Sequence, residues 1–282
     1  MNYRHAYHAG NFGDVLKHVI LVLTLRHLLQ KEAPIALLDS HAGIGRYDLA
    51  GAESGKTGEF RDGVLKVLAA RPAPPPLGPY IDILRRANGG ARGSGITTYP
   101  GSPEIAALLL RPQDRLLLNE LHPEDFAALR RAYRRDARVQ LHNLDGFQAV
   151  KALLPPKERR GVVLIDPAYE VPDDLARMVE ALVAGHRRFA TGVFLLWYPI
   201  KGLKPIRRMQ ADLKQSGIRR ILAADLLIQS TDDNERLNGA GMVIVNPPWQ
   251  LDEELRRVLP WLARTLGRDR AAAGSVSWVV PE

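Results

Sequence analysis

The chain has 282 residues, of which 46% are hydrophobic and 25% charged, as expected of a globular protein with one large domain or two small ones. It contains no cysteine, which excludes disulfides, thiolate metal sites and cysteine nucleophiles. The net charge of +8 favours a polyanionic partner, most simply a nucleic acid.

The N-terminal residues do not resemble a signal peptide, because no apolar core follows the first basic residue. The most apolar early run, residues 19–25, is too short to span a bilayer. We therefore expect a cytoplasmic protein.

The first third of the chain predicts an arm, a helix, a strand and an irregular insertion. Residues 1–11 show no periodicity and are expected to form an N-terminal arm, and Asp14 then opens a helix to about Lys31. The apolar run 35–39 predicts a strand. Residues 48–98 are rich in glycine, proline and charge, which predicts a small inserted helical subdomain with helical patterns at 64–70 and 80–87.

The rest of the chain alternates between strand and helix patterns. Ser102 followed by Pro103 predicts the N-cap and first position of a helix over 104–110. The remaining expected strands are 115–121, 139–143, 162–166, 192–198, 218–228 and 241–245, the expected helices are 124–135, 146–154, 173–186, 205–216 and 251–266, and a last extended piece covers 276–280.

This alternation predicts a mostly parallel sheet with helices on its faces. The two strands 218–228 and 241–245 are joined by a polar loop without a helix, so they are expected to be antiparallel neighbours. A seven-stranded, mostly parallel sheet with one antiparallel strand is the pattern of the Rossmann-like fold of S-adenosylmethionine-dependent methyltransferases. We expect all 282 residues to form one such domain.

The most informative stretch is the buried strand that ends in Asp166, Pro167, Ala168 and Tyr169. Open α/β sheets bind ligands at the carboxyl ends of their strands. A carboxylate and a fixed backbone carbonyl accept the two N–H bonds of an amine, and an aromatic ring offers a flat face to a base. The competing interpretation is an ordinary Asp-Pro turn.

Three further strand ends carry candidate ligand-binding residues. A glycine-rich turn with His41, Gly43 and Gly45 follows the first strand, where glycine allows close approach of a ligand. The acid that a dinucleotide site needs about 20 residues further on is not at a strand end. Glu120 stands at the edge of the next strand, where a carboxylate would hold a ribose, and Asp145 either caps the following helix or meets an adenine edge.

A second amine-recognition pattern, Asn246-Pro247-Pro248-Trp249, follows the expected antiparallel strand. The end of an antiparallel strand points to the opposite edge of the sheet, away from the glycine-rich turn. We therefore expect the two prolines only to separate this strand from the helix that follows.

The whole chain resembles the bacterial 23S ribosomal RNA adenine-N6 methyltransferases that modify adenine 2030. The strings that carry the resemblance are Tyr3-Arg4-His5, residues 8–11 and 14–18, 41–43 with 45–47, 99–103, 120–123, 145–147, 196–199 and 280–282.

The resemblance implies roles for particular residues. S-adenosylmethionine contacts are implied for His18, His41, Gly43, Ser102, Glu120, Asp145, Gly146 and Asp166. Catalytic contacts to the target amine and base are implied for Asp166, Pro167 and Tyr169, and handling of the RNA for Tyr3, His5 and Lys17. The family pattern reads Asp-Pro-Pro-Tyr, and Ala168 here replaces the second proline, which predicts a looser loop with retained activity.

The implied reaction is in-line methyl transfer to the N6 amine of a flipped-out adenine. No metal is expected, because the eight histidines show no ligand spacing with acids. We expect a monomer that acts on protein-free 23S rRNA or an early assembly intermediate, with Lys17 neutralising a phosphate. A DNA adenine methyltransferase would use the same pocket, and an RNA-binding protein with a vestigial pocket is the rival from another class; a nicotinamide dehydrogenase fits the glycine pattern poorly.

Overall fold

The computed structural model describes residues 4–90, 95–171 and 173–282. Tyr3, one of the residues predicted to handle RNA, lies outside this part of the chain. The strands are β1 (Ala36–Asp39), β2 (Arg46–Asp48), β3 (Thr98–Pro100), β4 (Arg115–Asn119), β5 (Val139–His142), β6 (Gly161–Ile165), β7 (Val193–Ile200), β8 (Ile221–Leu227), β9 (Gly239–Val245) and β10 (Ala273–Val280).

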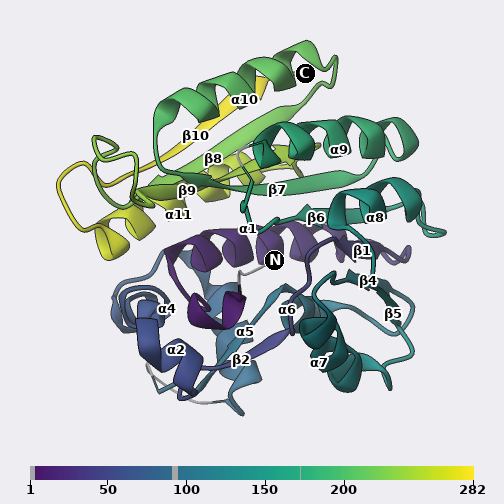
Figure 1. Cartoon of the computed structure of the whole chain (residues 1–282), viewed down its shortest axis with the longest axis horizontal. Helices are drawn as coiled ribbons and strands as arrows, with labels where there is room; N and C mark the ends of the chain where they lie inside the picture. The colour runs from purple at the N-terminus through teal and green to yellow at the C-terminus, as the bar shows by residue number, and fades with distance from the viewer. Residues whose placement is uncertain (1–3, 91–94, 172) are drawn as a thin grey trace.

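The helices surround these strands, and two short 3₁₀ helices accompany them (Figure 1). They are η1 (His5–Tyr7), α1 (Phe12–Leu28), α2 (Ala52–Thr57), α3 (Glu59–Asp62), α4 (Val64–Ala69), η2 (Pro75–Leu77), α5 (Gly78–Ala87), α6 (Ser102–Leu109), α7 (Pro123–Tyr133), α8 (Gly146–Ala152), α9 (Asp174–Arg188), α10 (Leu203–Gln215) and α11 (Leu251–Leu266).

The main sheet has eight strands in the order β10-β8-β9-β7-β6-β1-β4-β5. β1, β4, β5, β6 and β7 are parallel, and β9 lies antiparallel between β7 and β8. The predicted fold, a mostly parallel sheet with 241–245 antiparallel, is therefore confirmed. The predicted count of seven strands is too low, because the last extended piece pairs antiparallel with β8 as an edge strand, β10.

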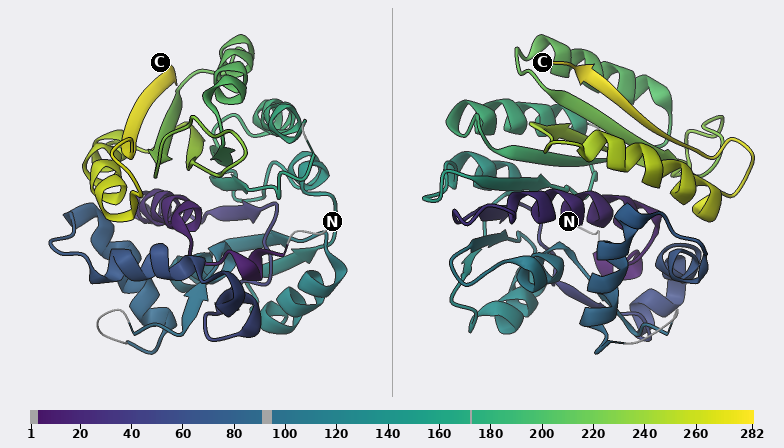
Figure 2. Two further views of the ribbon diagram at one scale, coloured as in Figure 1. Left: turned by 60° about the vertical axis from the view of Figure 1, so that its left-hand side comes forward. Right: turned by 180° about the vertical axis from the view of Figure 1, so that it is seen from behind.

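Helices cover both faces of the sheet (Figure 2). Alternate residues of each strand point to opposite faces, so Leu37 joins the core with α1, α6 and α11, and Leu38 joins the core with α8, α9 and α10. The central strands β1 and β6 are buried along their whole length. Burial on both faces explains their unbroken apolar sequences.

The segment between β1 and β4 holds a small two-stranded sheet, β2 with β3, and the helices α2 to α5. Asp48 pairs with Thr98, so the two ends of the expected insertion meet. Its apolar side chains, such as Val67 and Leu84, belong to the same core as α1 and α11. We interpret it as an insertion that extends the main core. The sequence patterns had not indicated β2, β3, α2 or α3.

Two local predictions are settled by backbone geometry. The N-cap of α6 is Gly101, and Ser102 is already helical, so the predicted Ser102 cap is wrong. Asn246 follows the antiparallel strand β9 at the sheet edge opposite Asp166, as predicted, and its side chain binds the carbonyls of Ala190 and Gly192. None of the described helices is long and apolar enough to cross a membrane.

Candidate active site

A cavity of about 620 Å³ opens at the carboxyl ends of the parallel strands. Its size is typical of small-molecule sites. Ten predicted site residues lie in its wall, and Ala168 lies there with them: His5, Lys17, His41, Gly43, Glu120, Asp145, Gly146, Asp166, Pro167 and Tyr169. They come from separate parts of the chain, and the sheet brings them to one edge, as the strand-end argument predicted.

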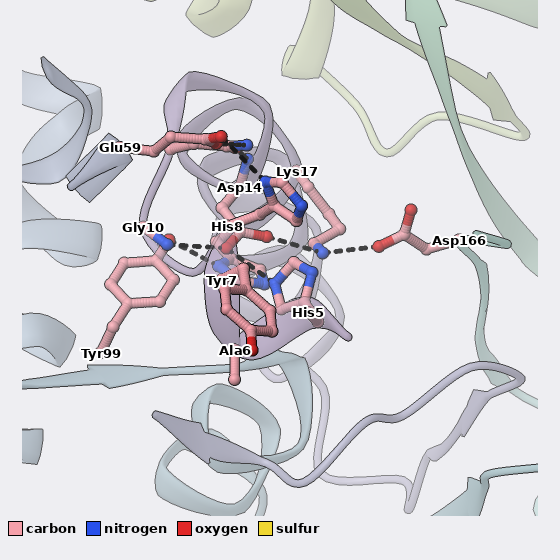
Figure 3. Close-up of polar contacts among 12 residues, drawn as sticks. His5, Ala6, Tyr7, His8, Gly10, Asp14, Lys17, Glu59, Tyr99 and Asp166 are labelled. Carbon is pink, nitrogen blue, oxygen red and sulfur yellow. Dashed lines mark hydrogen bonds and ion pairs between the residues drawn. The ribbon is translucent and has the colours of Figure 1, made fainter. Parts of the chain in front are cut away.

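Asp166 follows β6 directly and is held by a lysine from α1 (Figure 3). Lys17 Nζ lies 2.5 Å from Asp166 Oδ2 and 2.8 Å from Asp14 Oδ1. Asp14 Oδ2 in turn accepts hydrogen bonds from the Gly10 N–H and from His5 Nε2, each at 2.9 Å. Asp166 is thus linked through Lys17 and Asp14 to His5 of η1.

Lys17 and Asp14 are both held in their charged forms. Burial favours neutral Lys17, but Asp14 and Asp166 outweigh it and raise the pKa of Lys17 well above its ordinary value. Burial likewise opposes ionisation of Asp14, and His5 and Lys17 outweigh it and lower the pKa of that carboxyl well below its ordinary value. Because Lys17 is only 5% exposed and already paired with two carboxylates, the structure does not favour the predicted contact of its ammonium with an RNA phosphate.

The Asp166 loop is bent and anchored at Tyr169. Tyr169 has a backbone φ of +53°, a value that residues other than glycine rarely adopt. Its ring packs against Trp197, with 5.8 Å between the ring centroids. Its hydroxyl donates to the backbone carbonyl of Trp197 and lies 3.1 Å from Met178 Sδ. These contacts fix the ring as part of the cavity wall.

Arg177 of α9 ties this loop to α8. Its guanidinium pairs with Asp174 at 3.1 Å and Asp145 at 3.4 Å, and lies 4.6 Å from the centroid of Phe147. The buried Asp174 also accepts the Val171 N–H at 3.1 Å. The sequence carries no signal for Arg177, because Asp145 and Phe147, which it joins to Asp174, lie about 30 residues before it in the chain.

The glycine-rich turn and Glu120 are joined directly. Gly43, with φ +60°, donates its N–H to Glu120 Oε2 at 2.8 Å, and the His122 N–H donates to Oε1 at the same distance. Burial raises the pKa of Glu120 in spite of these two bonds. A carboxylate at this depth, 7% exposed, faces the cavity at the end of β4.

His41 and Gly146 form the adjacent wall. A Cβ at Gly146 would lie 2.2 Å from His41 Nε2, so only glycine leaves room for the ring. Ser40 Oγ lies 2.8 Å from His41 Nδ1, and burial lowers the pKa of His41 to about 4. His41 is therefore neutral at pH 7. Asp145 caps α8 through the N–H groups of Phe147 and Gln148, which confirms the predicted cap.

Two residues predicted to contact the cofactor do not line the cavity. His18 is fully buried on α1, where its Nδ1 lies 2.7 Å from the Tyr99 hydroxyl. Ser102 is buried at the start of α6, where its hydroxyl offsets part of the rise that burial causes in the pKa of Asp39. Within the described residues, no group of three or more histidines and acids could hold a metal ion.

The structure also adds Asp14 to the site, a residue to which the sequence assigned no part in it. Asp14 was interpreted only as the start of a helix, yet it links Lys17 to His5. Its burial at the N-terminus of an apolar helix was the available signal, because a buried acid requires a partner.

The sheet order, the antiparallel strand β9 and the cavity at the strand ends define an S-adenosylmethionine-dependent methyltransferase of the Rossmann-like class. A family model described as "Ribosomal RNA large subunit methyltransferase D, RlmJ" matches residues 32–280. The chain is 43% identical over 282 residues, the full length of both chains, to "Ribosomal RNA large subunit methyltransferase J" of Escherichia coli and equally to that of Haemophilus influenzae.

A crystal structure of a Legionella pneumophila protein superimposes with a TM-score of 0.86 at 31% identity, covering 96% of this chain and 98% of the other. The chain therefore belongs to this family of large-subunit ribosomal RNA methyltransferases.

Proposed function

We propose that this protein methylates N6 of a single adenine of 23S rRNA, the one that corresponds to adenine 2030, with S-adenosylmethionine as donor. The observation that carries the proposal is the position of Asp166, Pro167 and Tyr169 in the wall of the cavity that Glu120 and Gly43 also line. Amine recognition and cofactor recognition then share one cavity. Family membership supports ribosomal RNA as the substrate.

The residues of the cavity fit the cofactor. Gly43 has no side chain at the point where the turn bends next to Glu120, and a Cβ there would meet the Tyr47 hydroxyl at 2.3 Å. The Glu120 carboxylate is an acceptor suited to ribose hydroxyls, and the Asp145–Gly146 segment offers backbone and carboxylate groups to an adenine edge. When bound, S-adenosylmethionine supplies an electrophilic methyl group on a sulfonium.

The protein's own part in the reaction is to bind and orient the amine. Lys17 occupies Asp166 Oδ2, and we assign Oδ1 to one N6–H and the Pro167 carbonyl to the other. Two such acceptors fix the direction of the nitrogen lone pair, which is a contribution of positioning. The ring of Tyr169, held by Trp197, provides the surface for the flipped base. The proton leaves to Asp166 or to water.

The test is transfer of labelled methyl from S-adenosylmethionine to protein-free 23S rRNA by the wild type, Asp166→Ala and the surface control Glu180→Ala. We expect label in one adenine, a loss of roughly 100-fold or more in Asp166→Ala, as for loss of a key active-site group, and wild-type transfer by Glu180→Ala. Binding of S-adenosylmethionine by Asp166→Ala, measured by calorimetry, shows that the variant is folded. Wild-type turnover by Asp166→Ala would refute the assignment.

The rival functions are distinguished in the same assay. Duplex DNA as substrate tests the DNA methyltransferase, which family membership disfavours. An RNA-binding protein with a vestigial pocket would bind rRNA and transfer no label.

A further inference from the structure

The C-terminal end of α7 and the turn that follows it carry a cluster of four arginines that the proposed reaction does not use. Arg130, Arg131, Arg134 and Arg135 are all exposed. Arg130 and Arg131 lie in the last turn of α7, Arg134 is its C-cap and Arg135 follows in the turn, whereas Leu129 and Tyr133 of the same helix are buried. We call Arg130, Arg131, Arg134 and Arg135 the α7 arginine cluster.

The α7 arginine cluster has no ion-pair partner among residues 4–90, 95–171 and 173–282. Nearby acids are engaged elsewhere: Glu124 and Asp125 pair with Arg4, and Asp136 pairs with Arg138. Other arginines at comparable exposure, such as Arg177, Arg220 and Arg256, do have acidic partners. Four positive charges are thus concentrated on one surface without local compensation.

The helix dipole accounts for only part of this concentration. Cations in the last turn of a helix gain roughly 0.3–1 kcal/mol each from the dipole, and Arg130, Arg131 and the C-cap Arg134 stand where this effect acts. Repulsion between Arg130 and Arg134, four residues apart at the end of the helix, costs roughly 0.2–0.5 kcal/mol. An anion that bridges several of the guanidinium groups would remove the repulsion.

The α7 arginine cluster is continuous with the cavity. Leu121 and Asp125, at the start of α7, line the cavity, and the helix leads away from them. With a rise of 1.5 Å per residue, Arg130 lies roughly 8 Å and Arg134 roughly 14 Å along the helix from Asp125. Successive phosphates of a nucleic acid strand are separated by a few ångströms, so a strand with its target base in the cavity reaches this surface within a few nucleotides.

We propose that the α7 arginine cluster is a docking surface for the phosphate backbone of the substrate RNA next to the target adenine. This inference rests on the proposed function and extends it by assigning the surface that holds the RNA outside the cavity. Guanidinium groups bind phosphate oxygens through two parallel N–H bonds, which suits a backbone contact without sequence specificity.

The test replaces all four arginines by glutamine and compares the variant with a charge-matched control. The control replaces Lys204, Arg207, Arg208 and Lys214 of α10, which are also exposed and without an ion pair in the described structure. Both variants lower the net charge by four, from +8 to +4. Figure 1 shows α7 and α10 at opposite ends of the molecule. A difference in RNA binding between the two variants therefore reports a local contact and not the change in net charge.

Two measurements are made: the salt dependence of binding to a 23S rRNA fragment that contains the target adenine, and the kinetics of methyl transfer to it. We expect the slope of log K against log salt to fall in magnitude by roughly 3 for the α7 variant, at about 0.7–0.9 per phosphate contact, and by less than 1 for the α10 variant. KM for RNA should rise roughly tenfold or more at low salt with kcat unchanged, because the arginines do not touch the reacting atoms.

Equal slopes and equal KM values for the two variants would overturn the docking surface while leaving the proposed function intact. Absence of transfer to rRNA by the wild type would refute the proposed function and, with it, the inference. Unchanged affinity of both variants for S-adenosylmethionine verifies that each is folded.

Discussion

At the residue scale, Lys17 determines how the candidate catalytic carboxylate is presented. Its ammonium is 5% exposed and is shared between Asp14 and Asp166. Asp14 in turn holds His5, so the position of Asp166 depends on the N-terminal residues of the chain. The sequence suggested His5 and Lys17 as contacts to RNA and Asp166 as a contact to the cofactor and the target amine. Their coupling through Asp14 follows only from the structure, which brings Lys17 of α1 next to the residue after β6.

The residue-scale prediction is that Lys17→Gln destabilises the protein and impairs transfer together. Removing the ammonium leaves Asp14 buried beside another carboxylate without its cation, which costs roughly 3–5 kcal/mol in comparable buried pairs. Urea denaturation gives the free energy of unfolding, and Lys214→Gln on the surface is the control, expected within about 0.5 kcal/mol of wild type. A change for Lys17→Gln no larger than the control's would show that the buried pair contributes little.

At the scale of elements, the sequence predicted most helix boundaries because capping residues and glycines mark them. Asp145 caps α8, Gly217 has φ +75° after α10, and Gly267 ends α11, all at the predicted positions. The strands were recognisable because burial on both faces demands an unbroken apolar run. The short elements of the insertion, α2 and α3, carry no such signal, since each is six residues or fewer and is stabilised by tertiary contacts.

The candidate site was predictable to the extent that it lies at strand ends. Glu120, Asp145 and Asp166 come together because parallel strands end at one edge. The positions of His18 and Ser102 were not predictable in this way. They lie on helices, where the direction of a side chain depends on how the helix packs, and the structure buries both away from the cavity.

The Asp166–Tyr169 loop gives the prediction at this scale, Ala168→Pro. No hydrogen bond of the Ala168 N–H occurs within the described residues, so proline removes no bond, and it restricts the unfolded chain. We expect thermal stability to rise, by about 0.4–1 kcal/mol, and methyl transfer to be retained or increased. Ala184→Pro, in the interior of α9, is the contrasting control and should cost about 3 kcal/mol or more. A loss of both stability and transfer in Ala168→Pro would mean that the loop requires a backbone conformation that proline excludes.

At the scale of the whole molecule, two groups at the carboxyl end of β1, the buried Asp39 and the half-buried His41, act in opposite directions on the pH dependence of stability. Burial raises the pKa of Asp39 to about 6, and burial lowers the pKa of His41 to about 4. Between pH 4 and 6 the folded state binds a proton at Asp39 that the unfolded chain lacks, so this term falls as pH rises. Over nearly the same range the unfolded chain binds a proton at His41 that the folded state lacks, so that term rises with pH.

Replacing either group should leave only the pH dependence that the other group contributes to stability. In Asp39→Asn the free energy of unfolding should rise more steeply from pH 4 to 6.5 than in the wild type, by roughly 1–3 kcal/mol across the range, because only the His41 term remains. In His41→Gln the free energy of unfolding should rise less steeply with pH than in the wild type. The difference from the wild type should be smaller than for Asp39→Asn, because the ring borders the cavity, where water screens its charge. Urea denaturation at pH 4.5, 5.5 and 6.5 measures both slopes. Parallel pH profiles for the wild type and both variants would contradict the two shifts, whereas opposite deviations would show that a buried acid and a half-buried base at the carboxyl end of β1 offset each other in the pH dependence of stability.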